Sequence, residues 1–266
     1  MRDVRVPLRH RESYGPGLFS ISFELPDLAS SLLPGQFAML GVPGRSRPYL
    51  RRAFSIADSP GGAAIEFLVK TVGVGTACLE GLGPGDSVEV LGPLGNAFTV
   101  AGLSRSDRIA IVAGGVGVAP FPLLLRALGE RGVPADLFFG GRSAADLAYR
   151  RKISALVGLT GGEEFDATDD GSFGERARVT EVLARRLEAG TRYSRVFACG
   201  PTAMFRSLAP IVERFSLSAE FSTEAAMGCG FGVCLACVLP RPEGGYLVSC
   251  KEGPILAPAR VAWDKC

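Results

Sequence analysis

The sequence predicts a chain of three parts: an antiparallel β-barrel over residues 1–102, a parallel, doubly wound α/β domain over residues 103–218, and a small cysteine-loop domain over residues 219–266. Short runs of alternating apolar and polar residues, separated by glycine and proline, predict an antiparallel barrel or sandwich for the first part. Strand and helix patterns then alternate, which is typical of a parallel sheet covered by helices. The last part loses both patterns and concentrates cysteine and glycine.

Composition limits the classes of function that the chain can have. Hydrophobic residues make up 47% and charged residues 21% of the 266 residues, as in a globular protein with a real core. A net charge of +2 argues against nucleic acid or an anionic membrane as the main partner. The charged residues 1–20 contain no signal-peptide core, and no apolar run reaches about 18 residues, so we expect a cytoplasmic chain without membrane spans.

Five alternating runs in the barrel are expected to form strands, and residues 76–82 one or two turns of helix. The runs are LFSISFEL (18–25), QFAMLGV (36–42), AIEFLVKTV (64–72), DSVEVLGPL (86–94) and AFTV (97–100). Glycine and proline turn signals such as LPGQ, SPGG and GPGD separate these runs.

The α/β domain is expected to contain four strands, each followed by a helix. The expected strands are 108–115, 134–142, the first half of 162–172, and 194–201; the expected helices are 119–131, 143–157, 178–190 and 202–215. Ser143 is expected to cap the second helix, and Gly190 to end the third.

Four cysteines near the end of the sequence have the spacing of an iron–sulfur site. Cys229-x4-Cys234-x2-Cys237 is followed, after twelve further residues, by Cys250. The first three match the run with which plant-type ferredoxins hold a [2Fe–2S] cluster. Glycines at 228, 230 and 232 let the backbone wrap closely and offer N–H donors to negatively charged sulfur.

Two other interpretations of these cysteines stay open. Structural zinc usually takes two separated C-x2-C pairs, whereas three of the four ligands here lie within nine residues. The cysteines could also be small buried residues without a ligand. Seven cysteines in a cytoplasmic chain favour metal or redox chemistry over disulfides, with Cys78 expected in the core and Cys266 incidental.

A second motif, IVAGGVGVAPF, predicts an anion site at the end of the first α/β strand. The strand runs into Gly114, Gly115 and Gly117, and Pro120 then opens a helix. A glycine turn before a helix N-terminus can hold a pyrophosphate. The motif is not the G-x-G-x-x-G fingerprint, and a plain tight turn is the alternative.

One further motif of the α/β domain is consistent with ligand binding but does not require it. Cys199, Gly200 and Pro201 in FACGPTAM follow the last strand, at the edge where open α/β sheets bind ligands. A structural cysteine is the alternative for this motif.

The barrel carries the other such motifs. In RRAFSIAD, Arg52 and Ser55 could meet a phosphate or ring edge, while Phe54 could stack on a planar ring. Gly75 and Thr76 in VGVGTACLEGL precede a short helix and could hold a pyrophosphate. An ordinary barrel strand and turn would explain both motifs equally well.

The single histidine, His10, lies in the charged N-terminal stretch, and we expect it to be solvated. One histidine excludes Ser/His/Asp chemistry and histidine-rich metal sites. We therefore expect residues that bind and tune redox groups, and no proton-transfer catalyst of the chain's own.

Taken in order, RRAFSIAD, VGVGTACLEGLGPGDSVEVLGPLGNAF, AGGVGVAP and CGP resemble the ferredoxin–NADP⁺ reductase superfamily. That resemblance implies a barrel that binds FAD, followed by an α/β domain that binds a nicotinamide cofactor. DDGSFGERARVTEVL, EAAMGCGFGVCLACVL and SCKEGPIL are similar to the electron-transfer subunit of NAD-linked, heteromeric dihydroorotate dehydrogenases. The resemblance covers nearly the whole chain.

The resemblance also implies individual sites. FAD contacts are implied at Arg52, Phe54, Ser55, Gly75 and Thr76, and cluster ligands at Cys229, Cys234, Cys237 and Cys250. Phe54 stands where tyrosine is common in the superfamily, so a hydroxyl contact to the flavin would be lost. Arg142 could reach a 2′-phosphate, but a surface arginine is the simpler interpretation, and the family implies NAD.

The function that the resemblance implies is an electron relay. Electrons would pass between an FMN-containing dihydroorotate dehydrogenase catalytic subunit and NAD through the [2Fe–2S] cluster and FAD, in a heterotetramer serving pyrimidine synthesis. Similar subunits of ferredoxin:NADP⁺ transhydrogenases, sulfide dehydrogenases and hydrogenases are the alternative. One cluster ligand there can be a carboxylate, whereas this sequence offers four cysteines.

Overall fold

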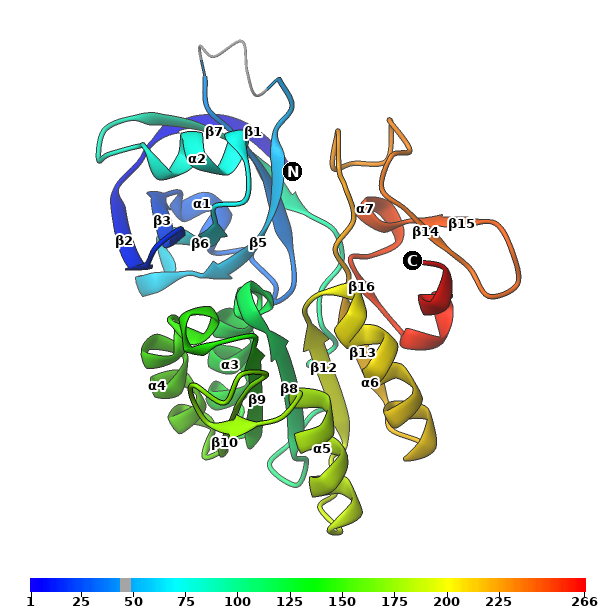
Figure 1. Ribbon diagram of the computed structural model, residues 1–266. Helices are drawn as coiled ribbons and strands as arrows, with labels where there is room; N and C mark the ends of the chain where they lie inside the picture. Colours follow the sequence, from blue (N-terminus) through cyan, green and yellow to red (C-terminus); the bar gives the residue numbers. More distant parts are fainter. Residues whose placement is uncertain (44–48) are drawn as a thin grey trace.

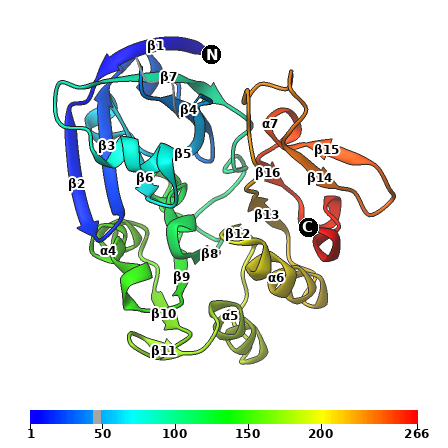
Figure 2. The ribbon, with the colours of Figure 1, turned by 45° about the horizontal axis from the view of Figure 1, so that its top comes forward.

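The computed structural model describes residues 1–43 and 49–266 and contains three parts in chain order (Figure 1). A curled antiparallel sheet lies above a helix-covered parallel sheet, and the C-terminal segment lies beside both (Figures 1 and 2). Within the described residues, every helix is too short or too polar to cross a lipid bilayer.

The first part is a seven-stranded antiparallel sheet with the order β1-β7-β4-β5-β6-β3-β2. Its strands are β1 (Arg2–Pro7), β2 (His10–Gly15), β3 (Leu18–Glu24), β4 (Phe37–Gly41), β5 (Arg52–Asp58), β6 (Ala64–Lys70) and β7 (Ser87–Leu94). Short helical segments join them: α1 (Pro26–Ala29), the 3₁₀ turn η1 (Pro60–Gly62) and α2 (Val74–Glu80). Phe19, Ile21, Phe23 and Phe67 fill the inside of the curl. The predicted antiparallel β part is confirmed.

Two details of this part differ from the sequence prediction. Residues 97–100 do not form a strand, because their backbone bonds go to unrelated segments: the Phe98 N–H donates to Pro34 O and the Thr99 N–H to Glu220. The charged N-terminal stretch, for which no strand was expected, forms the edge strands β1 and β2, with His10 exposed on β2.

The second part is a parallel sheet flanked by helices on both faces. The sheet has the order β11-β10-β9-β8-β12-β13-β16 and is parallel except for β16. Its strands are β8 (Ile109–Gly114), β9 (Ala135–Gly141), β10 (Glu164–Thr168), β11 (Glu175–Arg176), β12 (Arg195–Cys199), β13 (Ala219–Ser222) and β16 (Ile255–Leu256). The helical segments are η2 (Gly115–Val118), α3 (Phe121–Glu130), η3 (Ala144–Leu147), α4 (Arg150–Thr160), α5 (Val179–Glu188) and α6 (Thr202–Arg214).

Side chains of β8 alternate between two cores, as a strand buried on both faces requires. Ile109 and Ile111 pack with α3 and α4, whereas Ala110 and Val112 pack with α5 and α6. The predicted doubly wound arrangement is therefore confirmed.

The structure differs from the sequence prediction for one helix of this part and agrees with it at the end of another. The helix expected over 143–157 is two segments, η3 and α4, and Ser143 precedes η3 without a side-chain capping bond. Gly190 follows α5 with a φ of 97°, a conformation that suits glycine at a helix end. The sheet runs past the expected limit at residue 218, since β13 pairs with β12, so the domain limits stay predictions.

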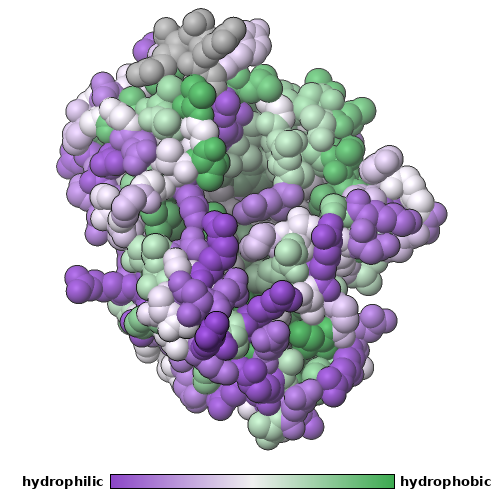
Figure 3. All heavy atoms as spheres, in the orientation of Figure 1, coloured by the Kyte–Doolittle hydropathy of each residue, from purple (hydrophilic) through white to green (hydrophobic). Residues whose placement is uncertain are grey.

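The third part is mostly irregular and returns to the α/β sheet. It contains the hairpin of β14 (Val238–Pro240) and β15 (Tyr246–Val248), the one-turn helix α7 (Ser249–Glu252), and the 3₁₀ turns η4 (Pro258–Arg260) and η5 (Trp263–Lys265). Cys237 and Cys250 pack against Phe37, Met39 and Leu94 of the barrel. Figure 3 shows hydrophobic side chains gathered over this part, next to a hollow between it and the barrel.

Ion pairs join the barrel to the α/β domain. Arg126 of α3 donates two hydrogen bonds to the fully buried Asp58, and Lys152 of α4 lies 2.5 Å from the buried Glu66. Tyr149, which precedes α4, packs edge-on against Tyr14 of β2. Each of these buried carboxylates in the barrel therefore has a cationic partner from the α/β domain, which offsets the cost of burying its charge.

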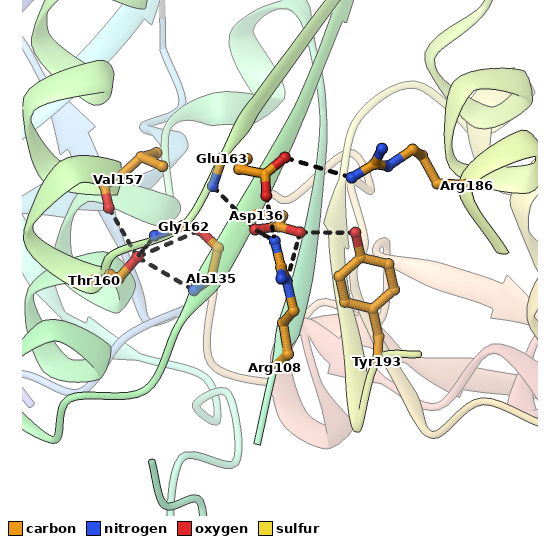
Figure 4. A network of polar contacts seen from close by, with 9 residues as sticks. All are labelled: Arg108, Ala135, Asp136, Val157, Thr160, Gly162, Glu163, Arg186 and Tyr193. Carbon is orange, nitrogen blue, oxygen red and sulfur yellow. Dashed lines mark hydrogen bonds and ion pairs between the residues drawn. The ribbon is translucent and has the colours of Figure 1, made fainter. Parts of the chain in front are cut away.

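A buried carboxylate also ties the amino ends of the parallel strands together (Figure 4). Asp136 of β9 accepts two bonds from Arg108 at 2.9 Å, one from the Tyr193 hydroxyl at 2.8 Å and one from the Glu163 N–H at 2.9 Å. Hydrogen bonds on both oxygens offset the cost of burying the charge. This network lies at the edge of the sheet opposite to the glycine turn.

Candidate functional site

The two glycine motifs of the α/β domain meet at the point where the strand order reverses. The parallel strands follow the order β11-β10-β9-β8-β12-β13, so β8 and β12 are neighbours although far apart in sequence, with Cys199 opposite Ala113. Open α/β sheets bind ligands at the carboxyl ends of such strands. A Cβ on Gly117 would lie 2.4 Å from Cys199 O and 2.7 Å from Gly200 Cα, so this contact requires glycine.

A cavity of about 470 Å³ opens beside this contact. Gly114, Gly115 and Pro201 line it, together with the residues that begin α5 and α6. Because the N–H groups at helix N-termini carry partial positive charge, several of them facing one cavity favour an anionic ligand such as a pyrophosphate. Gly117 and Gly200 make the close packing beneath the cavity and do not line it.

A larger cavity of about 670 Å³ lies between all three parts of the chain. The residues of the sequence motifs that line it are Arg52, Phe54, Ser55, Thr76, Pro120 and Cys199. Residues of the C-terminal segment, including Ala225 and Met227, close its other side. Burial raises the pKa of the Cys199 thiol, so this side chain is a neutral thiol at neutral pH.

Gly75 positions the arginine of the larger cavity. A Cβ on Gly75 would lie 2.2 Å from Arg52 Nε, so only glycine leaves room for the arginine side chain here. The Thr76 hydroxyl accepts the N–H groups of Val72 and Gly73 at 2.8 and 3.1 Å and fixes the turn. Arg52 also donates to Leu50 O. The motifs RRAFSIAD and VGVGTACLEGL therefore form one contact surface, as a cofactor with phosphates and a planar ring requires.

The four cysteines of the C-terminal loop stand as two pairs. The Cys234 N–H donates to Cys229 Sγ at 3.4 Å, and the Cys250 N–H donates to Cys237 Sγ at 3.3 Å. Cys199, Cys229, Cys234, Cys237, Cys250 and Cys266 are free thiols. In the described parts of the chain, no three histidine, cysteine or acidic side chains surround a single metal position.

The environment of the thiols suits an iron–sulfur centre. Desolvation opposes ionisation of Cys229, but the N–H groups of Cys234, Phe231 and Val233 outweigh it and lower its pKa to about 6. Burial raises the pKa of Cys250, and the neighbouring Cys237 raises it further. Two pairs of thiols with N–H donors to sulfur match a two-iron centre, in which each iron takes two terminal thiolates. A single zinc ion would need all four ligands around one point.

Two glycines allow the backbone turns and the close packing of the cysteine loop. Gly230 and Gly232 have φ values of 84° and 89°, and a Cβ on Gly230 would lie 2.6 Å from Met39 Cγ. The loop therefore packs directly on barrel strand β4, which forms one wall of the core shared by Cys237 and Cys250. Cys234 is exposed at the tip of the loop, between the exposed apolar side chains of Val233 and Leu235.

Sequence reasoning missed two charged residues of the site. Lys70, at the end of β6, and Glu224, after β13, line both cavities. Lys70 Nζ lies 2.6 Å from Asp146, a residue of η3 that also lines the smaller cavity. No motif marks either residue, because each stands at a junction that only the assembled domains create.

Comparison with known proteins assigns each part. Residues 5–98 match the oxidoreductase FAD-binding domain, residues 111–209 the oxidoreductase NAD-binding domain, and residues 224–262 the iron–sulfur cluster binding domain of dihydroorotate dehydrogenase B. The electron transfer subunit of NAD⁺-linked dihydroorotate dehydrogenase B from Bacillus caldolyticus is 39% identical over 86% of each chain. The chain belongs to the family of dihydroorotate dehydrogenase B electron transfer subunits.

Further members of this electron transfer subunit family are similar over nearly their whole length. Those of Desulforamulus reducens and Enterococcus faecalis are each 30% identical, over 94% of this chain and 94 to 95% of theirs. A solved structure described as an NADH-dependent reduced ferredoxin–NADP oxidoreductase has the same fold, with a TM-score of 0.83 over 98% of this chain and 90% of its own, at 24% identity. The FAD, NAD and iron–sulfur modules expected from the sequence are thus confirmed.

Proposed function

We propose that this chain carries electrons between an FMN-containing dihydroorotate dehydrogenase catalytic subunit and NAD, with FAD and a [2Fe–2S] cluster as its redox groups. The observation that supports this most is the position of the larger cavity. Val116 and Glu224 connect it to the smaller cavity, and Met227 connects it to the cysteine loop. A flavin there would lie between nucleotide and cluster, as a relay requires.

The larger cavity is proposed as the FAD site. Arg52, Ser55 and Thr76 would hold the phosphates and polar ring edges, Phe54 would pack on the ring, and Gly75 would keep Arg52 in place. When bound, FAD would exchange a hydride with NAD and single electrons with the cluster. The chain's residues bind, orient and exclude water, since the cavity walls are mostly apolar.

The smaller cavity is proposed as the NAD site. Gly114, Gly115 and Pro201 would allow the pyrophosphate to approach the helix N-termini, and Gly117 and Gly200 would hold the two turns together. Pro120 and Cys199 lie on the wall of the larger cavity, where they would face the flavin and the reacting end of NAD.

Cys229, Cys234, Cys237 and Cys250 are proposed as the cluster ligands, paired as the hydrogen bonds pair them. The exposed apolar side chains beside Cys234, namely Phe231, Val233 and Leu235, are proposed as the face that docks on the catalytic subunit. Figure 3 shows the hydrophobic surface of this region. We propose a heterotetramer with that subunit, located in the cytoplasm.

Co-expression with the FMN-containing catalytic subunit tests this function. The expected result is a complex with about one FAD and one [2Fe–2S] cluster per copy of this chain, which oxidises dihydroorotate and reduces NAD⁺. If the chain copurified with a different partner, and reduced ferredoxin or sulfide replaced dihydroorotate as the electron donor, the related transhydrogenase or sulfide dehydrogenase function would hold instead.

A further inference from the structure

Asn96 joins the barrel to the segment that follows the last cysteine of the loop. It stands two residues after strand β7, and its side-chain Nδ2 donates to Ile255 O at 2.7 Å. Its Oδ1 accepts the Ile255 N–H at 2.9 Å, and its own backbone N–H donates to Gly253 O at 2.9 Å. Asn96 therefore binds this segment as a neighbouring β-strand would.

The same segment is bound on its other side by the α/β domain. The Thr223 N–H and the Thr223 hydroxyl both donate to Pro254 O at 2.9 Å. This hydroxyl also lies 3.2 Å from the hydroxyl of Ser249, the residue directly before Cys250. Residues 253–255 are thus held between the barrel and the parallel sheet.

This segment connects the cysteine loop to the larger cavity. Cys250 packs with Leu94 of the barrel before the segment begins, and Pro254, within the segment, lines the larger cavity. Gly95 lies so close to Pro254 that a Cβ on the glycine would be 2.5 Å from the proline Cδ. A shift of the segment against the barrel would therefore move Cys250 and a wall of the cavity together.

The amide group of Asn96 suits the backbone that it binds. Asn96 itself lies at the surface, whereas Ile255 is 5% exposed. Ile255 belongs to β16, the last strand of its sheet, so the N–H and C=O on its outer side have no strand partner among the described residues. An amide carries a donor and an acceptor side by side and satisfies both groups, which a carboxylate or an alkyl group cannot do.

We propose that Asn96 is a positioning residue of the electron relay, which fixes Cys250 against the barrel and so holds the cluster in its place relative to the flavin. The inference rests on the proposed function. Residues that orient a metal ligand matter nearly as much as the ligand, and their loss typically costs about 10- to 100-fold in metal affinity or activity. Asn96 acts through the backbone segment that it binds and not by contact with the cluster.

Two variants, studied in the purified holo complex with the catalytic subunit, test this role. Asn96→Leu keeps the branched shape of the side chain and loses both bonds to Ile255, whereas Asn96→Asp keeps the acceptor alone. We expect Asn96→Leu to lose iron to an added chelator about tenfold faster than the wild type, and Asn96→Asp to lose it at an intermediate rate. The electron paramagnetic resonance spectrum of the reduced complex should change in both variants, because one thiolate is reoriented, while the FAD content stays unchanged.

Ser59→Ala is the matched control. It removes a side-chain bond to a backbone carbonyl, that of Ala64 at 2.9 Å, in the turn between β5 and β6 and outside both cavities. Iron loss and spectrum should equal those of the wild type. If Asn96→Leu does not assemble with the catalytic subunit, Asn96→Asp decides alone, because it keeps one of the two bonds.

The outcomes separate this inference from the proposed function. If the wild-type complex contains FAD and the cluster, and the Asn96 variants keep its spectrum and its rate of iron loss, the role of Asn96 is wrong while the relay stands. Faster iron loss with an unchanged spectrum would also overturn the role, since it would show lower stability without displacement of Cys250. If the wild-type complex contains no iron–sulfur cluster, the proposed function itself is wrong.

Discussion

Close contacts between single residues hold the proposed nucleotide site together. Gly117 brings the turn after β8 against the end of β12, and the smaller cavity opens beside this contact. Sequence reasoning placed both turns at the carboxyl edge, because strand ends can be read from the pattern. It could not show that Gly117 supports the cavity from beneath, because that depends on which strands are neighbours.

Gly117→Ala should push the two turns apart. A methyl group 2.4 Å from a backbone oxygen forces the backbone to move, so we expect a loss of unfolding free energy of about 1–3 kcal/mol and weaker NAD binding. Urea unfolding measures the loss of unfolding free energy. Gly158→Ala is the control: Gly158 lies in α4 with open space around it, and this change should leave stability unchanged or raise it by up to about 1 kcal/mol.

Asp136→Asn tests the network at the opposite edge of the sheet. It removes the charge that pairs with Arg108 while Asp136 is fully buried, so we expect a loss of about 3 kcal/mol in urea unfolding. Asp27→Asn removes a similar pair with Arg2, but both side chains are more than half exposed, and the change should stay within about 0.5 kcal/mol. Equal effects of the two changes would show that burial does not decide the strength of these pairs.

The elements that can be predicted from the sequence are those with regular apolar spacing and with glycine or proline at their ends. The α/β strands and helices have buried faces on each side, so their apolar spacing is strong. Edge strand β1 has little such signal, because it buries only one face and carries charges on the other. Residues 97–100 have the alternating pattern of a strand but do not form one. Their apolar side chains alternate because the segment contacts both neighbouring domains.

The cysteine loop is the element that should contact the catalytic subunit. Leu235→Ala removes an exposed apolar side chain, 60% accessible, at the loop tip without touching a cysteine. We expect about tenfold weaker association of the two subunits, measured by sedimentation or calorimetry, with an unchanged iron content. Leu159→Ala on α4 is the matched control, since Leu159 is 61% accessible, and it should not alter association. Equal association of both variants would remove the loop from the interface.

At the scale of the whole molecule, function depends on sites between domains. The larger cavity has walls from all three parts, and Lys70 and Glu224 acquire their positions only when these parts pack together. The separate sequence motifs predicted residues in the walls of the cavity, whereas no motif marks Lys70 or Glu224 at the junction of the domains. The arrangement of the domains is therefore part of the site.

The Lys70–Asp146 pair across the domain boundary should make stability depend on pH. Desolvation raises the pKa of Asp146, but Lys70 and the Arg142 N–H outweigh it, so the net pKa is lowered. A lowered folded-state pKa gives stability that is complete above the unfolded-state value of about 3.9 and is lost as the pH falls below it.

In Lys70→Met the loss of unfolding free energy between about pH 5 and pH 3 should therefore be shallower than in the wild type, by about 1 kcal/mol after allowance for solvent screening. Urea unfolding at several pH values measures this difference. The exposed Lys265, changed to methionine, serves as the control and should follow the wild-type pH profile. A Lys70→Met profile parallel to the wild type would mean that the pair does not form in solution.

The central claim is that four thiolates, in two pairs, hold a two-iron centre next to the flavin cavity. The most direct measurement is the iron and acid-labile sulfide content, with the electron paramagnetic resonance spectrum of the reduced complex, for the wild type and for Cys234→Ser. The account predicts about two irons and two sulfides per chain in the wild type, and a lost or altered signal with little electron flow to the catalytic subunit in the variant. Zinc without sulfide in the wild type, or an unchanged spectrum and electron flow in Cys234→Ser, would contradict it.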